Sequence, residues 1–284
     1  TDQLGHLYSH RHGIQKGQEV EPDFWRKIPL DLQQAIKWYT YAAESGSVSA
    51  CIRLGYMHRQ GVGVPLNYKH SLCWYRKAAK AGDKKGCEWL GYFYSHGLDR
   101  NAEWEHLPHC WNGIKKDYQK ALKWYLKAAS RGLEASQYMV GFFYSHGAVN
   151  NYSKNQELTQ IYLEIPGIPL DYQEAIEWYI KAAKQRLTIA HRKLGFLYLH
   201  GGFGIQENAQ EAFDWYIKGA RKGDAVCMRK VAYCYEDGIG TQKGLPQAIE
   251  WYSKAVQHGD AFAQELLDSK LAQEKASFFF NSRP

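Results

Sequence analysis

Residues 117–132 read DYQKALKWYLKAASRG, and this stretch decides the fold. Its apolar residues recur at spacings of three and four, which places them on one face of an α-helix. Asp117 stands where a helix N-cap is expected, and Gly132 stands where a glycine ends a helix in the left-handed conformation. The stretch therefore predicts one amphipathic helix. The residues expected in its buried stripe are Ala121, Trp124, Tyr125, Ala128 and Ala129.

The dipeptide Trp-Tyr at the centre of this helix occurs six times, at spacings of 36, 50, 54, 37 and 36 residues. A period in the mid-thirties is typical of helical solenoids. After each copy a second helical pattern follows, as in LEASQYMVGFFYSHG at 133–147, with a glycine three residues before an aromatic. We name the two elements the Trp-Tyr helix and the glycine helix. The copies of Trp-Tyr lie at 38–39, 74–75, 124–125, 178–179, 215–216 and 251–252.

The glycine inside the second element needs a reason, because a glycine within a helix costs about 1 kcal/mol relative to alanine. We expect it to permit close approach of a neighbouring helix under the bulky Trp-Tyr pair. Two glycine helices depart from the pattern, with His58 in the aromatic position and Ala232 in the glycine position. The turn after the fourth Trp-Tyr helix carries Arg186 instead of glycine, and we expect that turn to be less regular.

These elements together resemble the Sel-1-like repeat family, a relative of the tetratricopeptide repeats. The matching pattern is A-x-x-W-Y-x-K-A-A followed by G, then L-G-x-x-Y-x-x-G, and it covers nearly the whole chain. The resemblance implies an all-α fold, a right-handed α/α superhelical solenoid of antiparallel helix pairs that serves as a protein-binding scaffold without catalytic residues. The cysteine-rich subgroup of the family is excluded, because the first helices carry alanine where that subgroup needs cysteine, at Ala43, Ala79 and Ala129.

We expect a single solenoid domain over residues 1–284. Residues 1–13 are expected to form the glycine helix of a first repeat that lacks its Trp-Tyr helix, and residues 244–284 the last repeat and a capping helix. We call the aromatic residue three positions after the glycine the marker aromatic. The distance from the marker aromatic to the next Trp is 16 residues in the compact connections and 30, 30 and 34 residues in three expanded ones. Full repeats are expected at 31–61, 67–97, 117–147, 171–201 and 208–238, and insertions at 11–29, 98–114 and 148–168.

The three insertions all lie in the same kind of connection, so we expect them to emerge on one edge of the solenoid. Long loops inside a compact array are more often functional than accidental. Each insertion also carries aromatic side chains, which either anchor the loop or bind a partner. The candidate protein-binding residues on this edge are Phe24, Trp25, Trp104, Trp111, Tyr152 and Tyr162.

The Trp-Tyr helices carry a lysine three residues after the Trp in every copy but the first, which has Tyr41. We expect the lysine stem to pack on the aromatic ring. The residue before the Trp is Lys37 in the first copy and Lys123 in the third, and by analogy with related solenoids this face lines a concave groove. Lys37 and Lys123 are therefore further candidate protein-binding residues. Later copies have Glu177, Asp214 and Glu250 there, each expected to pair with the lysine four residues on.

Few residues suggest chemistry. Four histidines precede the turn glycines, and we expect them to bond the last free carbonyls of their helices. The one tight set of soft metal ligands, His106, His109 and Cys110, lacks a second paired motif, so we predict no metal site. Nucleophile, nucleotide-binding and metalloprotease motifs are absent, so we predict a protein that is not an enzyme and has no cofactor. The four histidines are His10, His96, His146 and His200.

The composition is that of a folded chain, with 45% hydrophobic and 23% charged residues and a net charge of +7. No run approaches the ~18 apolar residues of a membrane span. The six cysteines show no CxxC pair, which favours a reducing compartment, the cytoplasm or a host cytosol, with the periplasm as an alternative. We expect a scaffold or adaptor whose partner is another protein, such as a bacterial host-interaction or secretion-related factor. The alternatives are an immunity protein that neutralises a secreted toxin and an RNA-binding solenoid.

Overall fold

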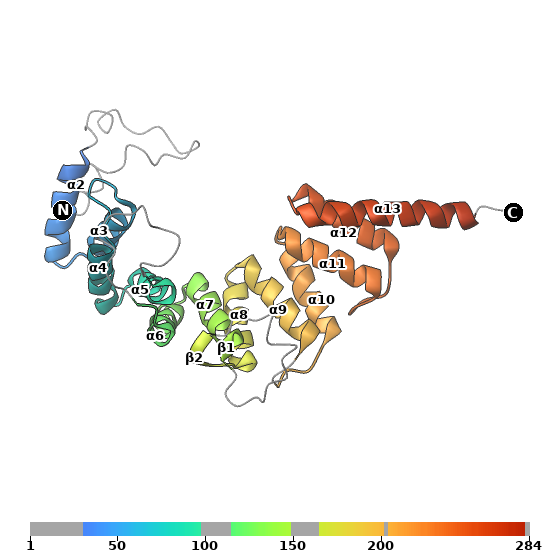
Figure 1. The fold of residues 1–284 in the computed structure, drawn as a ribbon, viewed down its shortest axis with the longest axis horizontal. Coiled ribbons are helices and arrows are strands. Elements are labelled where there is room, and N and C mark those ends of the chain that lie inside the picture. The colour runs from blue at the N-terminus through green and yellow to red at the C-terminus, as the bar shows by residue number, and fades with distance from the viewer. Residues whose placement is uncertain (1–30, 98–114, 149–164, 202–203, 282–284) are drawn as a thin grey trace. The chain divides into compact units, whose positions relative to one another are not determined.

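The computed structural model describes residues 31–97, 115–148, 165–201 and 204–281, with side chains as far as Glu274. These residues form helices in alternating Trp-Tyr and glycine types, as the sequence predicts (Figure 1). The expected glycine helix within residues 1–13 lies outside the described residues. The Trp-Tyr helices are α2 (Leu32–Glu44), α4 (Tyr68–Lys80), α6 (Tyr118–Ala129), α8 (Tyr172–Lys184), α10 (Ala209–Ala220) and α12 (Leu245–Gln257). The glycine helices are α3 (Val48–Gln60), α5 (Lys84–His96), α7 (Glu134–Ser145), α9 (Thr188–His200) and α11 (Ala225–Asp237), followed by α13 (Ala261–Asn281).

The chain divides into two compact units, unit 1 at Thr1–Ser136 and unit 2 at Gln137–Pro284, and each is described by itself. In unit 1, each helix from α2 to α6 packs against the helices next to it in the chain, and in unit 2 the same holds from α8 to α13. No helix in the described ranges is both long enough and apolar enough to cross a membrane. A single domain over residues 1–284 stays a prediction.

Local signals in the sequence set the helix ends. The carboxylate of Asp117 accepts a hydrogen bond from the backbone N–H of Lys120 at 2.8 Å, which confirms the predicted N-cap of α6. Gly132 has φ +79°, which confirms the predicted left-handed turn after that helix.

The turn after α8 corrects one expectation. Arg186 adopts φ +74°, the same left-handed conformation that glycine adopts in the equivalent turns. The backbone hydrogen bonds also match, because Arg186 donates to Ala183 and Leu187 donates to Ala182, as Gly132 and Leu133 do to Ala129 and Ala128. The turn is therefore as regular as the others, and the deviation from the consensus appears as backbone strain at a non-glycine residue.

The glycines of the glycine helices meet a tyrosine of the next Trp-Tyr helix. A Cβ atom placed on Gly91 would lie 2.8 Å from the ring of Tyr125, and one placed on Gly195 would lie 2.5 Å from the ring of Tyr216. Both distances are far below van der Waals contact, so only glycine lets the two helices come this close. The expected close approach is confirmed, and its partner is the tyrosine of the pair. The four contacts are Gly55–Tyr75, Gly91–Tyr125, Gly141–Tyr179 and Gly195–Tyr216.

The tryptophan of each pair lies differently from the expected stripe. Tyr125 is 3% exposed and Ala121, Ala128 and Ala129 are buried, as predicted, but Trp124 is only half-buried. A lysine ammonium covers five of the six tryptophan rings of the Trp-Tyr pairs at 4.0–4.4 Å from the ring centre, which confirms the expected packing of lysine on the aromatic. The five contacts are Trp74–Lys77, Trp124–Lys127, Trp178–Lys181, Trp215–Lys218 and Trp251–Lys254. The sixth ring, Trp38, meets Tyr41 instead.

The connections between repeats share one hydrogen bond whatever their length. In the compact connection after α3, the backbone N–H of Asn67 donates to the carbonyl of His58 at 2.8 Å. The expanded connection after α5 is closed by Asp117 and Tyr94, also at 2.8 Å. The N–H of the residue that begins a Trp-Tyr helix thus returns to the carbonyl of the marker position. The other such bonds are Asp171–Tyr144, Asn208–Tyr198 and Gly244–Tyr235.

A small parallel strand pair lies at the third insertion. Strand β1 (Gly147–Ala148) pairs with β2 (Ile165–Pro169). Ile165 and Ile168 are buried, and a Cβ on Gly147 would lie 2.5 Å from the carbonyl oxygen of Pro169. The end of this insertion therefore folds back onto its own repeat, and the strand pair is a local addition to the all-α solenoid that the sequence predicts.

Candidate protein-binding surface

An aromatic side chain follows the glycine position of each glycine helix in the described part of the chain. Since the glycine faces the neighbouring helix, the next residue is turned by about 100° around the helix axis, away from that contact. Three of the five side chains are tyrosines with 40–43% of their surface exposed, and the two phenylalanines are half-buried. We name these residues the aromatic row. They are Tyr56 and Tyr92 in unit 1, and Phe142, Phe196 and Tyr233 in unit 2.

Two residues of the row stack on a histidine one helical turn later, and a third, Phe196, lies against His200 with the rings tilted by 51°. The ring centres of Tyr92 and His96 lie 4.1 Å apart, and His96 Nδ1 lies 3.0 Å from the carbonyl of Tyr92. His146 makes the same contacts with Phe142, at 4.1 Å and 3.0 Å. His96 and His146 thus bond to a carbonyl in the last turn of their helices, as expected in position, but the carbonyl of Phe142 also accepts the backbone N–H of His146 and is not a free one. Each bond fixes the histidine ring and, through the stack, the neighbouring aromatic ring.

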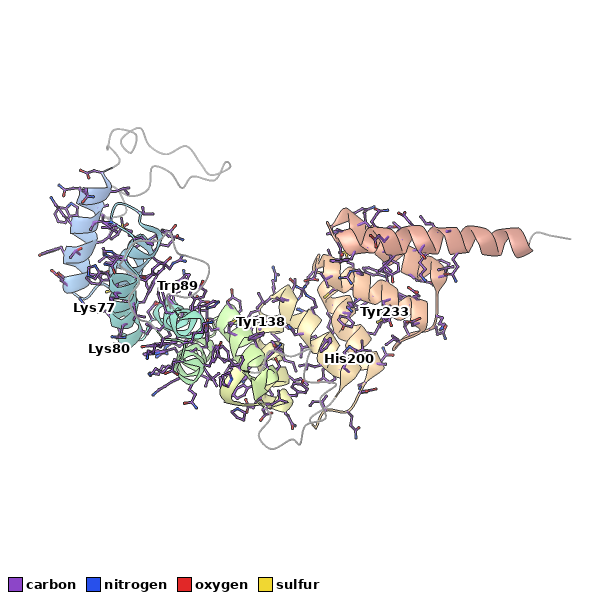
Figure 2. The ribbon with its side chains drawn as sticks, viewed as in Figure 1. Lys77, Lys80, Trp89, Tyr138, His200 and Tyr233 are labelled. Atoms are coloured by element: carbon purple, nitrogen blue, oxygen red, sulfur yellow. The ribbon has the colours of Figure 1, made fainter. Side chains whose placement is uncertain are left out.

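Unit 1 adds an arginine and a tryptophan to the row. The guanidinium carbon of Arg59 lies 4.0 Å from the ring centre of Trp89 and 5.7 Å from that of Tyr56. Trp89 is stacked on the buried ring of Tyr75, with centres 5.6 Å apart, and meets the edge of Tyr92 at 5.5 Å. Helices α3 and α5 therefore present one continuous cluster of aromatic rings around a cation. Trp89 is labelled on α5 in Figure 2.

Burial shifts the pKa of groups beside this cluster. It raises the pKa of Tyr75 to about 12, against the opposing effects of the Arg59 charge and of hydrogen bonding with the Arg59 guanidinium. It also raises the pKa of Glu88, to which the nearby Glu134 adds. The Tyr75 hydroxyl is therefore neutral at physiological pH, and the carboxyl of Glu88 is more easily protonated than an exposed one.

In unit 2, one of the two histidines on α9, His191, belongs to the core and not to the surface. His191 is buried, its Nδ1 lies 3.2 Å from the carbonyl of Leu187, and its Nε2 lies 3.1 Å from the Lys222 ammonium. Lys222 also donates to the carbonyl of Ala183 at 3.2 Å. Burial lowers the pKa of His191, and the charge of Lys222 lowers it further. The neutral imidazole can accept a hydrogen bond from Lys222, so Lys222 links the turn after α10 to both α8 and α9.

Comparison with known proteins identifies the repeat. The family model described as Sel1 repeat matches residues 26–47, 48–83, 85–103, 109–133, 134–165, 162–187, 188–224 and 225–260. The chain belongs to the Sel1 repeat family. Proteins built of Sel1 repeats generally mediate protein–protein interactions, and their solenoid is a scaffold fold that is typically non-catalytic.

Two solved structures place the chain among Sel1 repeat solenoids. A protective antigen present in uropathogenic Escherichia coli strains is 29% identical, with a TM-score of 0.73, and the match covers 96% of this chain and 49% of the antigen. A Sel1 repeat protein from Oxalobacter formigenes is also 29% identical, with a TM-score of 0.63, covering 84% of this chain and 83% of that one. The chain thus spans about half the length of the antigen. A search of curated protein sequences gives no match.

The Sel1 repeat model sets the repeat frame from a glycine helix to the Trp-Tyr helix that follows. Its match at 48–83 spans α3 and α4, and its match at 188–224 spans α9 and α10. In these two matches the contact between glycine and tyrosine ring, Gly55–Tyr75 and Gly195–Tyr216, joins the two helices of one repeat. The match at 225–260 carries Ala232 in place of the glycine. The expected units, such as 31–61, group the same helices with the Trp-Tyr helix first.

Charge is distributed unevenly between the two groups of Sel1 repeats. The described residues of unit 1 (31–97 and 115–136) hold 15 Lys and Arg and six Asp and Glu. The described residues of unit 2 hold 14 of each. Of the three expected pairs on the Trp-Tyr helices, Glu250–Lys254 forms, at 2.5 Å. Within the described ranges, Glu177 and Asp214 are not within ion-pair distance of Lys181 and Lys218, whose ammonium groups lie over tryptophan rings instead.

The structure reaches only part of the predicted site. Lys37 on α2 and Lys123 on α6 are both exposed, on separate Trp-Tyr helices of unit 1. The six aromatic candidates of the insertions, and the set His106, His109 and Cys110, lie outside the described residues. Within the described ranges no three His, Cys, Asp or Glu side chains are grouped as metal ligands would be. The aromatic candidates concerned are Phe24, Trp25, Trp104, Trp111, Tyr152 and Tyr162.

The aromatic row itself is missing from the sequence prediction. Its signal is present, because aligning the glycine helices on their glycine shows an aromatic residue at the next position in all five described copies. The marker aromatic two positions further on is half-buried in α5, α7, α9 and α11, so its recurrence reflects packing. The sequence shows that an aromatic recurs both one and three positions after the glycine. Only the exposed area in the structure shows that the tyrosines at the first position face solvent and that the second position packs against its neighbours.

Proposed function

We propose that this chain is a non-catalytic scaffold that binds another protein through the aromatic row of its glycine helices. The observation that carries the proposal is the repeated exposure of tyrosine at one register, at Tyr56, Tyr92 and Tyr233. Tyrosine and tryptophan are enriched among the residues that contribute most to protein–protein binding. Each unit carries its own stretch of the row, so each can contact a partner separately.

The inserted edge is the second part of the proposal. The hydrogen bond between the N–H of Asp117 and the carbonyl of Tyr94 brings the ends of the second insertion together, and Asp171 and Tyr144 do so for the third. Both insertions therefore leave from, and return to, the end of a glycine helix. This supports a surface in which the insertion aromatics extend the aromatic row.

Affinity capture from native lysate tests the proposal. The parent chain is compared with a Tyr56→Ser, Tyr92→Ser, Tyr233→Ser variant and with a chain whose three insertions are trimmed. We expect the triple variant to lose the captured protein while remaining folded, because 40–43% of each tyrosine is exposed, and melting curves check that it folds. The matched control is Tyr41→Ser, which removes a tyrosine that is 58% exposed on a Trp-Tyr helix and should keep capture intact.

The outcomes separate the two surfaces. Loss of capture in the trimmed chain alone would assign binding to the inserted edge. Equal capture by all four proteins would contradict both parts of the proposal. A single partner that binds stoichiometrically and is a toxin would favour the immunity alternative, and affinity that falls steeply with salt for RNA would favour the RNA-binding alternative.

A further inference from the structure

Arg59 and Trp89 occupy positions that the repeat leaves free. The residue four positions after the glycine is Arg59 in α3, and the residue two positions before the glycine is Trp89 in α5. Residues that the fold needs recur in each copy, as the glycine–tyrosine contacts do, whereas this pair occurs once in the described helices. The other residues at the first position are Ser95, Ser145, Leu199 and Glu236, and at the second Arg53, Met139, Lys193 and Lys230.

The pair is held in a fixed arrangement. Trp89 is stacked on Tyr75, whose ring in turn lies against Gly55, so the indole rests on the core of unit 1. The Arg59 guanidinium lies 4.0 Å from the indole centre, and its Nε is buried. Arginine held against an aromatic ring loses little further conformational freedom on binding, since its fork is already oriented. Tyr56 and Tyr92, both on the surface, flank this arrangement.

Among the described residues of unit 1, no carboxylate lies within ion-pair distance of Arg59. In the described ranges of unit 1, Lys120 is the one basic side chain within ion-pair distance of a carboxylate, that of Asp117. The remaining 14 basic side chains, Arg59 among them, face six carboxylates in total without such a contact. Within the described residues Arg59 Nε has no hydrogen-bond partner, although the guanidinium acts on the Tyr75 hydroxyl, where its charge and hydrogen bonding oppose the rise in pKa that burial causes. A guanidinium can bind a carboxylate through two parallel hydrogen bonds, so we expect the group that binds here to carry a carboxylate.

We infer that the cluster of Tyr56, Arg59, Trp89 and Tyr92 binds an acidic peptide segment of a partner protein. A carboxylate of the segment sits on the Nη atoms of Arg59, and an apolar side chain beside it packs on Tyr56 and Tyr92. The inference rests on the proposed function and adds the chemistry of the partner in unit 1. Unit 2, with 14 basic and 14 acidic side chains in its described residues, has no comparable charge excess.

The arrangement of the rings favours a peptide over a nucleic acid. Proteins that bind single strands stack successive bases on free aromatic faces. Here Trp89 already contacts Tyr75 and the Arg59 guanidinium, and Tyr92 is stacked on His96 at 4.1 Å. The rings therefore orient the cation, and the cation is the group presented to the ligand.

Fluorescence anisotropy with the full chain tests the inference. The probe is a short fluorescein-labelled peptide in which Asp and Glu alternate with Leu and Phe. Two further probes are the same peptide with Gln and Asn in place of the acids, and a labelled single-stranded RNA. The variant Arg59→Met removes the cation and keeps an apolar stem. The matched control is Lys80→Met, which removes the same charge from an exposed position on α4 (Figure 2).

We expect Arg59→Met to weaken binding of the acidic peptide by about tenfold or more, the loss typical of removing one partner of a close charged pair. Lys80→Met should weaken it by less than about threefold, as expected of a rim charge that is screened by salt. Arg59→Lys, which keeps the charge and loses the planar fork, should fall between the two. The neutral peptide should not compete. Melting curves of each variant show whether the fold is intact, and Arg59→Lys keeps the test valid if Arg59→Met does not fold.

Several results would overturn the inference. They are no binding of the acidic peptide, equal weakening by Arg59→Met and Lys80→Met, and tighter binding of the RNA than of the peptide. The proposed function is judged separately, by the protein captured through the aromatic row. If that protein binds Arg59→Met as tightly as the parent, the inference fails and the proposed function stands.

Discussion

The ring of Tyr125 lies against Gly91, and a Cβ atom at residue 91 would sit 2.8 Å from it. The glycine is therefore kept for the close approach of α5 and α6, against its own weak preference for helix. We predict that Gly91→Ala destabilises the chain by about 1–3 kcal/mol, the range for overpacking a well-packed core, although alanine is the better helix former. Chemical unfolding measures the change. A variant as stable as the parent would show that the ring moves aside freely.

The members of each Trp-Tyr pair should differ in their contribution to stability. Tyr125 is 3% exposed, whereas Trp124 is half-buried under Lys127. We predict that Tyr125→Ala costs about 3–5 kcal/mol, as for other fully buried aromatics. Trp124→Ala should cost about 1–2 kcal/mol, the sum of partial burial and a cation–π contact. Denaturant midpoints of the two variants give the comparison, and the reverse order would place the core on the tryptophan side.

Arg186 offers a gain in stability. Its φ of +74° is costly for a residue with a Cβ atom, and its side chain is exposed. We predict that Arg186→Gly stabilises the chain by about 1 kcal/mol, since a left-handed residue costs about 1–2 kcal/mol and glycine returns part of this as entropy of the unfolded chain. The converse variant is Gly132→Arg, in an equivalent turn where a Cβ would meet nothing within 4 Å. It should lose a similar amount, and unchanged melting in both would remove the strain argument.

Buried histidine makes stability depend on pH in one direction. Burial and the Lys222 charge lower the pKa of His191 in the folded state, so the unfolded state binds the proton more readily. The stabilisation is fully present above the unfolded pKa of about 6.5 and is lost as the pH falls below it towards the folded pKa. We predict that His191→Gln, which keeps an acceptor for Lys222 without titrating, reduces the loss of stability between neutral and mildly acidic pH.

Two other histidines contribute to the same slope, so the variant should reduce the slope without abolishing it. Burial lowers the pKa of His58, with His70 adding to the effect, and burial lowers the pKa of His146, with Lys193 adding. Urea unfolding over a pH series measures the slope. Lys222→Met provides a second reading, because removing its charge should bring the pKa of His191 closer to the ordinary value. A parent and a His191→Gln variant with equal slopes would contradict the assignment.

The insertion tryptophans carry the last prediction. Trp104 and Trp111 have no counterpart in the compact connections, such as the one that Asn67 closes on His58. We predict that Trp104→Ala with Trp111→Ala weakens partner binding by more than about 2 kcal/mol and changes stability by less than about 1.5 kcal/mol. Thermal melting beside partner affinity decides. Lost stability with unchanged affinity would make the two rings loop anchors.

The fold could be predicted because its signals are local and repeated. The Trp-Tyr spacing, the cap at Asp117 and the turn at Gly132 all concern residues within one helix or one turn, where period and chemistry suffice. The contact between Gly91 and Tyr125 was anticipated only in kind, since choosing between the two rings of a pair requires the packed geometry. The turn at Arg186 differs from the expectation because its backbone hydrogen bonds hold a non-glycine residue in the conformation that glycine adopts in the equivalent turns.

The candidate site was predicted less well than the fold. Exposure of Tyr56 and Tyr92 depends on how neighbouring glycine helices cover one another, and Arg59 meets Trp89 across a gap of 30 residues in the chain. Neither fact follows from a repeat pattern, which shows what the copies share. A residue that occurs in one copy alone cannot be found by comparing the repeats. The structure identifies it by placing it beside residues that recur.

The N–H that precedes each Trp-Tyr helix from α4 to α12 donates to the carbonyl at the marker position of the preceding glycine helix, and this bond makes the connection a site where other sequences can be inserted. Asn67 and His58 close a segment of eight intervening residues, and Asp171 and Tyr144 close one of 26, with lengths of 2.8 and 2.9 Å. Because loop closure becomes only slowly less favourable with length, a segment can be exchanged, lengthened or randomised there with little effect on the helices on either side. The scaffold can therefore acquire a new recognition loop by replacement at one connection while its repeats stay in register.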